Sequence, residues 1–270
     1  MTEVPPKSSL PGVKEMLIGP TGSGKTVSIA TWLEAGIKPY AIFTEPSFEV
    51  LGDAKFGNCL SKIDWDYIPP ANTEFSDILA SAKLINQLTM KGLSNLDDIG
   101  KSKHQEFMKL VSMLNEKQVD KFGTDRVLVL DSLSGLNIMA MNLVVGSKPV
   151  KSMADWGIAM DNEERLIQKL CTGLRCHFML TAHAEMERDE VSGQTFIMAG
   201  TLGRKLAPKL PRFFSDAIYA KREGSNFTWS TVEMGADLKA RNLPYQAGLK
   251  ASFVPVIETW KSRGGIIASA

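Results

Sequence analysis

One short stretch of the chain combines glycines, a lysine and a hydroxyl group at a spacing suited to phosphate chemistry. It reads Gly19-Pro20-Thr21-Gly22-Ser23-Gly24-Lys25-Thr26, a complete match to the pattern GxxxxGK[ST]. The glycines let the backbone wrap a phosphate group, so that its N–H groups point inward at the positive end of the following helix. We expect Lys25 to reach the β- and γ-phosphates and the Thr26 hydroxyl to bind magnesium. The motif therefore predicts a site for ATP and Mg²⁺.

The segments around this motif predict the elements that must position it. A short apolar strand is expected over residues 15–18, directly before the motif, and a helix over 25–34, directly after it. A second strand over 40–44 completes the strand–helix–strand unit of a parallel sheet. The apolar runs RVLVLD (126–131) and HFMLT (177–181) suit strands that are buried on both faces. We therefore predict an α/β P-loop NTPase fold, with a mainly parallel central sheet flanked by helices.

Three polar residues at the ends of these strands are candidates for catalysis. Asp131 ends the RVLVLD strand, where an acid commonly holds the magnesium ion and its bound water. Many P-loop ATPases carry a glutamate directly after this aspartate, but Ser132 stands there in this chain. Glu45 follows the second strand and is the alternative general base, unless it is an ordinary loop acid. His183 follows HFMLT, where it either senses the γ-phosphate or serves the structure alone.

The rest of the chain divides into segments around this core. We expect a flexible leader over residues 1–13, an ATPase domain over 14–245 and a C-terminal tail over 246–270. Within the domain, 73–123 is predicted to be a helical insert and 184–210 a long, mobile, charged loop. Loops of that length are usually functional or disordered. Further expected elements are helices near 76–90, 103–121, 136–145 and 155–174, a loop over 92–100, and an antiparallel pair over 217–221 and 227–232.

Composition narrows the class of protein and its compartment. The chain has 270 residues, 44% of them hydrophobic, and a formal net charge of +1. A global basic signature of nucleic-acid binding is therefore missing, and DNA contacts would need a local patch or several subunits. Three cysteines without a CxxC pair favour a reducing compartment. The sequence shows neither a signal peptide nor an apolar run of about 18 residues. We expect a cytoplasmic protein, or one of the host cytoplasm if it is viral, with no membrane partner.

Taken together, these residues resemble the core of RecA-type recombinases. The resemblance is closest to the compact phage RecA-like ATPases that act as single-strand annealing proteins. It covers about residues 14–245 and depends on the P-loop, on Thr44-Glu45, on LVLDSLSGL (128–136) and on KARNLP (239–244). It implies a DNA-stimulated ATPase that acts on single-stranded DNA in recombination or annealing, with Glu45 as the catalytic glutamate. It also implies a homo-oligomer, a filament or a ring, with ATP between subunits. A single-strand-binding protein is a plausible further partner.

The resemblance assigns roles to several other cations. The segment after His183 corresponds to a DNA-contacting loop, whose candidate basic residues are Arg204, Lys205 and Lys209. Lys239 and Arg241 match a pair of cations that reach the γ-phosphate bound by the neighbouring subunit. An ordinary solvated surface is the alternative for both sets.

The sequence departs from the recombinase pattern in three places. His183 stands where recombinases usually carry glutamine. A separate N-terminal oligomerisation domain is not seen, and the insert is longer than a minimal core needs. Annealing or loading is therefore expected in preference to full strand exchange.

Other P-loop functions remain open at this level. In a small-molecule or nucleotide kinase the insert would be a substrate lid, but phosphate-holding arginines are absent from residues 73–123. A motor or packaging ATPase would ordinarily carry a glutamate after Asp131. A nucleotide-gated scaffold would require that Glu45 is catalytically idle.

Overall fold

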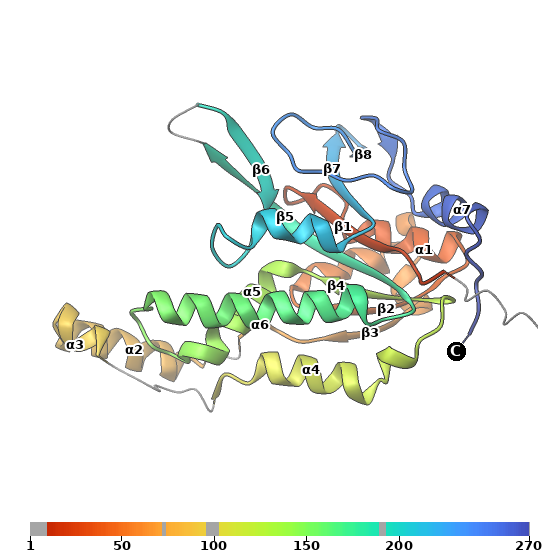
Figure 1. Cartoon of the computed structure of the whole chain (residues 1–270). Helices are drawn as coiled ribbons and strands as arrows, with labels where there is room; N and C mark the ends of the chain where they lie inside the picture. The colour runs from red at the N-terminus through yellow and green to blue at the C-terminus, as the bar shows by residue number, and fades with distance from the viewer. Residues whose placement is uncertain (1–9, 72–73, 96–102, 189–192, 270) are drawn as a thin grey trace, which may run out of the picture.

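A mostly parallel sheet forms the centre of the molecule (Figure 1). The computed structural model describes residues 10–71, 74–95, 103–188 and 193–269. The strands follow the order β3-β2-β4-β5-β1-β7-β8-β9, with β6 paired to β5. Every pair from β3 to β7 is parallel, whereas β6, β8 and β9 add antiparallel pairs. The strands are β1 (Lys14–Gly19), β2 (Lys38–Phe43), β3 (Asp64–Tyr67), β4 (Arg126–Asp131), β5 (His177–Arg188), β6 (Thr195–Ala199), β7 (Asp216–Glu223), β8 (Asn226–Ser230) and β9 (Leu249–Lys250).

Helices cover both faces of this sheet and confirm the α/β fold class (Figure 1). One apolar cluster joins one face to α4, α5 and α6, and a second cluster joins the other face to α1 and α7. The helices are α1 (Ala30–Glu34), α2 (Phe75–Gln87), α3 (Met90–Ser94), α4 (Glu106–Glu116), α5 (Leu133–Val145), α6 (Met153–Thr172) and α7 (Val254–Ser262). None of the helices described here combines the length and the apolar character needed to cross a membrane.

Burial of β4 on both faces explains why its sequence is a continuous apolar run. Leu128 and Leu130 belong to the cluster with α4, α5 and α6, whereas Val127 and Val129 belong to the cluster with α1 and α7. Successive side chains of a strand point to opposite faces, so a strand covered on both faces needs apolar residues at every position. Asp131 then places a carboxylate where the strand ends.

The register of the sheet brings the candidate residues to one edge. Phe43 of β2 pairs with Asp131 of β4, and Gly19 of β1 pairs with His183 of β5. Because these strands are parallel, their carboxyl ends meet at the same edge of the sheet, where open α/β sheets bind their ligands. β5 lies between β1 and β4, so the strand that carries His183 separates the P-loop strand from the strand that carries Asp131.

Two predictions about segments of the core need correction. The expected helix over 25–34 begins later, as a 3₁₀ turn over Val27–Ile29 that leads into α1. The expected loop over 184–210 is wrong in part, because β5 continues to Arg188 and pairs with β6, and a 3₁₀ helix covers Ala207–Phe213. Residues 189–192 of that segment lie outside the described residues. Apolar and polar residues alternate over residues 182–187 of β5 and could have indicated this extension of the strand, but the charged residues of the segment dominated the sequence pattern.

The two ends of the chain also belong to the domain, although a leader and a tail were expected there. Within the predicted leader, of which residues 1–9 lie outside the described part, the Val13 amide donates to His177 Nδ1 at 3.0 Å. Within the predicted tail, Trp260 of α7 is buried and its Nε1 donates to the Pro11 carbonyl at 2.9 Å. The ends are therefore joined over the face that α1 covers.

The helical character predicted for 73–123 is present in α2, α3 and α4. The loop expected over 92–100 overlaps the end of α3, and its residues 96–100 lie outside the described part of the chain.

Candidate active site

The P-loop leaves β1 at Gly19 and turns through two glycines with positive φ, Gly22 at 75° and Gly24 at 85°. A side chain at Gly24 would be strained by this φ, and its Cβ would also lie 2.6 Å from the ring of Phe227. Glycine at this position therefore allows the loop both its left-handed turn and its contact with an aromatic ring.

Lys25 is folded into this loop. Its Nζ donates to the Gly19 carbonyl at 2.8 Å and to the Pro20 carbonyl at 2.9 Å, and only 7% of the residue is exposed. Burial lowers the pKa of Lys25, while the charges of Asp131 and Glu45 oppose that shift. The side chain thus supplies a cation at the bottom of the loop, where a phosphate chain would lie.

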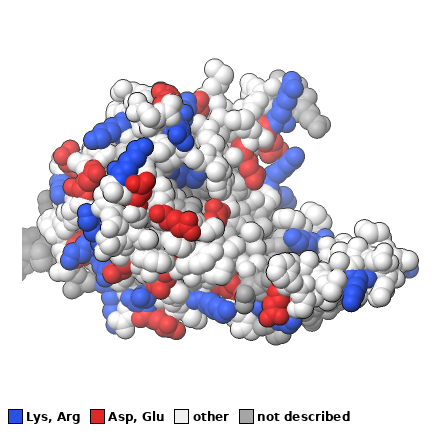
Figure 2. All heavy atoms as spheres, turned by 180° about the vertical axis from the view of Figure 1, so that it is seen from behind, with Lys and Arg blue, Asp and Glu red and all other residues white. Residues whose placement is uncertain are grey.

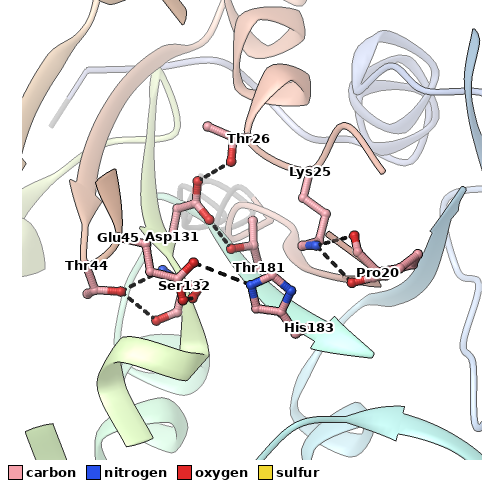
Figure 3. A network of polar contacts seen from close by, with 10 residues as sticks. Pro20, Lys25, Thr26, Thr44, Glu45, Asp131, Ser132, Thr181 and His183 are labelled. Atoms are coloured by element: carbon pink, nitrogen blue, oxygen red, sulfur yellow. Dashed lines mark hydrogen bonds and ion pairs between the residues drawn. The ribbon is translucent and has the colours of Figure 1, made fainter. Parts of the chain in front are cut away.

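Asp131 meets the two hydroxyl groups that flank it (Figure 3). Thr26 Oγ1 donates to Asp131 Oδ2 at 2.7 Å, and the Thr181 hydroxyl donates to Oδ1. Burial raises the pKa of Asp131, whereas the hydrogen bonds from Thr181 and Thr26 act in the opposite direction. The predicted magnesium ligands Thr26 and Asp131 are therefore adjacent, and their oxygen atoms fit the preference of Mg²⁺ for hydroxyl and carboxylate ligands alongside phosphates. Thr181 was not singled out in the sequence, although its place at the end of an apolar strand could have suggested it.

Glu45 lies beside this pair, just beyond the end of β2 (Figure 3). Ser132 Oγ donates to Glu45 Oε1 at 2.7 Å, and His183 Nε2 lies 3.4 Å from Oε2. The second distance is at the limit of a hydrogen bond, so the serine contact is the stronger one. About a third of each side chain, Glu45 and His183, is exposed. Both groups are therefore accessible to solvent within the site.

A cavity of about 440 Å³ contains these residues. P-loop residues 21–27, Glu45, Asp131 and His183 line one part of it. Its remaining lining comes from segments that sequence reasoning missed: Val50, Lys55, Phe56, Arg222, Ser225 and Phe227. The ring centroids of Phe56 and Phe227 are 6.5 Å apart. A 3₁₀ turn after β2 carries the first ring and the β7–β8 hairpin carries the second, and no spacing in the sequence joins the two.

Lys239 and Arg241 lie away from this cavity. Lys239 pairs with Ala217 at the start of β7, and its Nζ donates to the Phe214 carbonyl at 2.6 Å. The Arg241 amide donates to Asp216 Oδ1 at 2.7 Å. The start of β7 is at the sheet edge opposite the P-loop, because β7 runs parallel to β1. The structure does not bring these cations to the phosphates of their own chain, and a role towards a neighbouring subunit stays a prediction.

The basic residues predicted to contact DNA follow β6. Arg204 pairs with Glu187 of the hairpin at 3.0 Å, and Lys209 pairs with Glu164 of α6 at 2.8 Å. Lys205 is exposed between them. Figure 2 shows basic and acidic side chains interspersed over one whole face of the molecule, around a central hollow. Arg204 and Lys209 are each paired with an acidic side chain, and DNA binding by the three cations stays a prediction.

The fold and the site together define a P-loop NTPase: a phosphate-binding loop after one parallel strand, with a magnesium-type acid after another. The model of the AAA domain family matches residues 12–242, and the chain belongs to that family. Family and site support ATPase activity.

Two solved structures are similar to the chain over most of its length. The RadB recombinase is 14% identical over 89% of this chain and 86% of its own, with a TM-score of 0.43. The flagellar accessory protein FlaH from Methanocaldococcus jannaschii is 12% identical over 88% of this chain and 84% of its own, with a TM-score of 0.41. No curated protein matches the chain. At these TM-scores neither likeness adds to the assignment, which depends on the family match and on the site.

Proposed function

We propose that this protein hydrolyses ATP with Glu45 as the general base, and that it does so on single-stranded DNA in recombination or annealing. The observation that carries the first part is the place of the Glu45 carboxylate. It lies beside Asp131 and His183 in the same cavity as the P-loop, and the Ser132 hydroxyl holds one of its oxygens at 2.7 Å. A carboxylate in that position can orient and polarise a water molecule that attacks the γ-phosphate.

The other residues of the site supply position and charge. Lys25 holds the phosphate chain with the backbone N–H groups of the loop, and Thr26 and Asp131 would hold magnesium. When bound, magnesium neutralises charge that develops on the phosphate oxygens. Because little covalent chemistry is required of the protein, most of the rate acceleration comes from such positioning and electrostatics. Glu45 adds the one group that accepts a proton from the attacking water.

The aromatic residues that line the cavity suit the nucleoside. Phe56 and Phe227 supply two aromatic rings, with Lys55 and Arg222 close to them. The ring centroids are 6.5 Å apart and the ring planes are inclined by 39°, so a purine in this space would stack on one ring and touch the other. Stacking on an aromatic ring contributes about 1–3 kcal/mol per base. Phe227 also touches the backbone at Gly24, so the triphosphate would begin next to this ring.

The DNA part of the proposal is supported by the continuity of β5. His183 lies within this strand, which continues into the β5–β6 hairpin, and the His183 carbonyl accepts a hydrogen bond from the Gly200 amide at 2.8 Å. A strand of single-stranded DNA bound near Arg204, Lys205 and Lys209 would thus act on an element that also carries the γ-phosphate sensor. In a filament or ring, Lys239 and Arg241 would face the nucleotide of the neighbouring subunit.

ATP hydrolysis with and without single-stranded DNA tests this proposal in the wild type and in the variants Lys25→Ala and Glu45→Gln. Loss of a general base typically lowers kcat by about 10²–10⁴-fold. Glu49→Gln is the matched control, because Glu49 is an exposed acid of the 3₁₀ helix Pro46–Gly52, which directly follows Glu45, and it does not line the cavity. We expect DNA to stimulate ATP hydrolysis by the wild type. Both variants should hydrolyse ATP at a small fraction of the wild-type rate, with or without DNA, and the Glu49→Gln control should hydrolyse it at the wild-type rate.

Two results would contradict the proposal. A Glu45→Gln protein at the wild-type rate would exclude Glu45 as the base. If DNA does not change the rate of ATP hydrolysis, the DNA-dependent part of the proposal is wrong. A kinase that transfers the phosphoryl group to another acceptor would then be the alternative to test.

A further inference from the structure

The ends of β2 and β4 are joined by an exchange of hydrogen bonds next to the site (Figure 3). Thr44 Oγ1 accepts a hydrogen bond from the Ser132 amide at 2.9 Å and donates to the Ser132 carbonyl at 3.1 Å. The Thr44 amide donates to the Asp131 carbonyl at 2.7 Å. Thr44 is completely buried and Ser132 is 1% exposed. The backbone of Ser132 is therefore fixed against β2 by one threonine side chain.

The glycine at position 135 makes this arrangement tight. It lies in the first turn of α5, where an added Cβ would meet Thr44 Oγ1 at 2.2 Å and Thr44 Cβ at 2.3 Å. Thr44 thus fills the space that a larger residue would occupy, and helix α5 closes against it. Rotation of the Thr44 side chain away from Ser132 is sterically limited by this contact.

The Ser132 hydroxyl is used in an unusual way for its position. Ser132 is the N-cap residue of α5, where a serine oxygen ordinarily accepts a hydrogen bond from the backbone of the first turn. Among the described residues, α5 has no such side-chain cap. The hydroxyl donates instead to Glu45 Oε1 at 2.7 Å. The helix forgoes a stabilising cap, and a carboxylate at the site gains a hydrogen-bond donor.

We infer that Ser132 is a positioning residue for Glu45, held in place by Thr44 and Gly135; this inference rests on the proposed role of Glu45 as the base. Glu45 is on the loop that follows β2, is about one-third exposed and has only the 3.4 Å approach of His183 as a second polar contact in the described part of the site. A carboxylate with several open rotamers must be oriented before it can orient a water molecule. Ser132 fixes one oxygen and leaves the other, which lies 3.4 Å from His183 Nε2, available to a water molecule.

If Ser132 positions Glu45, its effect on the rate must depend on the Glu45 carboxylate. A double-mutant cycle measures this dependence. Ser132→Ala is made in the wild type and in Glu45→Gln, and kcat and KM for ATP are determined with single-stranded DNA. In the wild-type background we expect kcat to fall about 10- to 100-fold with little change in KM, because a misplaced base costs rate and leaves the phosphate-binding loop intact. In the Glu45→Gln background we expect no further loss.

Two more variants complete the test: Ser230→Ala controls for a general effect on folding, and Thr44→Val tests whether Thr44 supports Ser132. Ser230→Ala removes the hydroxyl of another buried serine, which donates to the Val232 carbonyl away from the cavity, and should leave kcat at the wild-type value. Thr44→Val keeps the shape of the threonine and removes the hydroxyl that holds Ser132. It should lower kcat in the same way as Ser132→Ala, and again only where Glu45 is present.

The outcomes separate this inference from the proposed function. If Glu45→Gln is slow while Ser132→Ala retains the wild-type kcat, the positioning role is wrong and the base assignment stands. Equal losses from Ser132→Ala in both backgrounds would show a merely structural role and would also overturn the inference. If Glu45→Gln itself has the wild-type rate, the proposed base and the inference fail together.

Discussion

The aromatic part of the cavity provides a direct test of where the nucleoside binds. Phe56 and Phe227 line the cavity together, and the Phe227 ring lies against Gly24 of the P-loop. Replacement of Phe227 by alanine removes one of two candidate stacking surfaces and leaves Lys25 and the loop backbone in place. Truncation of a base-stacking aromatic ring costs about 1–3 kcal/mol. We therefore expect ATP to bind roughly 5- to 150-fold more weakly to Phe227→Ala.

Binding of ATP and of inorganic triphosphate, both measured by calorimetry, separates stacking from support of the loop. Inorganic triphosphate has the phosphate chain but lacks the base and the sugar. If Phe227 stacks on the base, its loss weakens ATP binding and leaves the affinity for triphosphate unchanged. If Phe227 only supports Gly24, both ligands lose affinity by the same factor.

Equal losses for the two ligands, or full affinity for ATP, would refute the assignment of this end of the cavity to the base. Phe56→Ala should reproduce the loss for ATP, because the two rings face the same space. Phe75→Ala is the matched control: Phe75 begins α2 and is 91% exposed, and it does not line the cavity. Its affinities for ATP and for triphosphate should equal those of the wild type.

Three further predictions concern stability and DNA. Glu163 of α6 is fully buried, and burial raises its pKa to about 8 from the usual 4.5. The unfolded chain loses this proton at lower pH than the folded one, so stability falls as pH rises through this interval, by about 1.4 kcal/mol per pH unit. Urea unfolding should therefore find Glu163→Gln more stable than the wild type at pH 7.5, with a difference that disappears near the usual pKa of the group; a constant difference would contradict this. Trp260→Ala should lower the free energy of unfolding by about 3–5 kcal/mol in the same assay, because a buried ring and its bond to Pro11 are lost; a loss below 1 kcal/mol would contradict it. Arg204→Ala and Lys209→Ala should each weaken binding of single-stranded DNA and reduce its salt dependence by about 0.7 in log–log slope, as titrations at several salt concentrations would show; unchanged slopes would contradict it.

The phosphate-binding end of the site could be predicted from the sequence because its signals are local. Lys25 and Thr26 lie within one motif, and Asp131 ends an apolar run that marks a strand buried on both faces. The parallel pairing of these strands then brings Glu45 and His183 to the same edge. Each step needs only a strand, its end and the rule that parallel strands share an edge.

Other parts of the molecule could not be predicted in this way because they depend on contacts between distant segments. Phe56 and Phe227 meet across a turn and a hairpin that are about 170 residues apart, and neither has a distinctive neighbour in sequence. The hairpin of β5 and β6 was not recognised because the end of β5 carries three charged residues, Glu185, Glu187 and Arg188. Helix α7 was predicted to belong to a tail, because the sequence does not show what buries it. In the structure it packs in one apolar cluster with Trp32 and Phe253, whose rings stack with centroids 4.1 Å apart.

The separation of Asp131 and Glu45 onto two strands has a consequence for how this site keeps its geometry. When a glutamate directly follows the metal-holding aspartate, the local backbone fixes the distance between the two carboxylates. Here the two groups belong to β4 and to the end of β2, so the bonds between those strands must fix it. Phe43 pairs with Asp131, and Thr44 binds the backbone of Ser132. A serine directly after the aspartate then has a use of its own, because its hydroxyl binds the carboxylate of Glu45, the residue that we propose as the base.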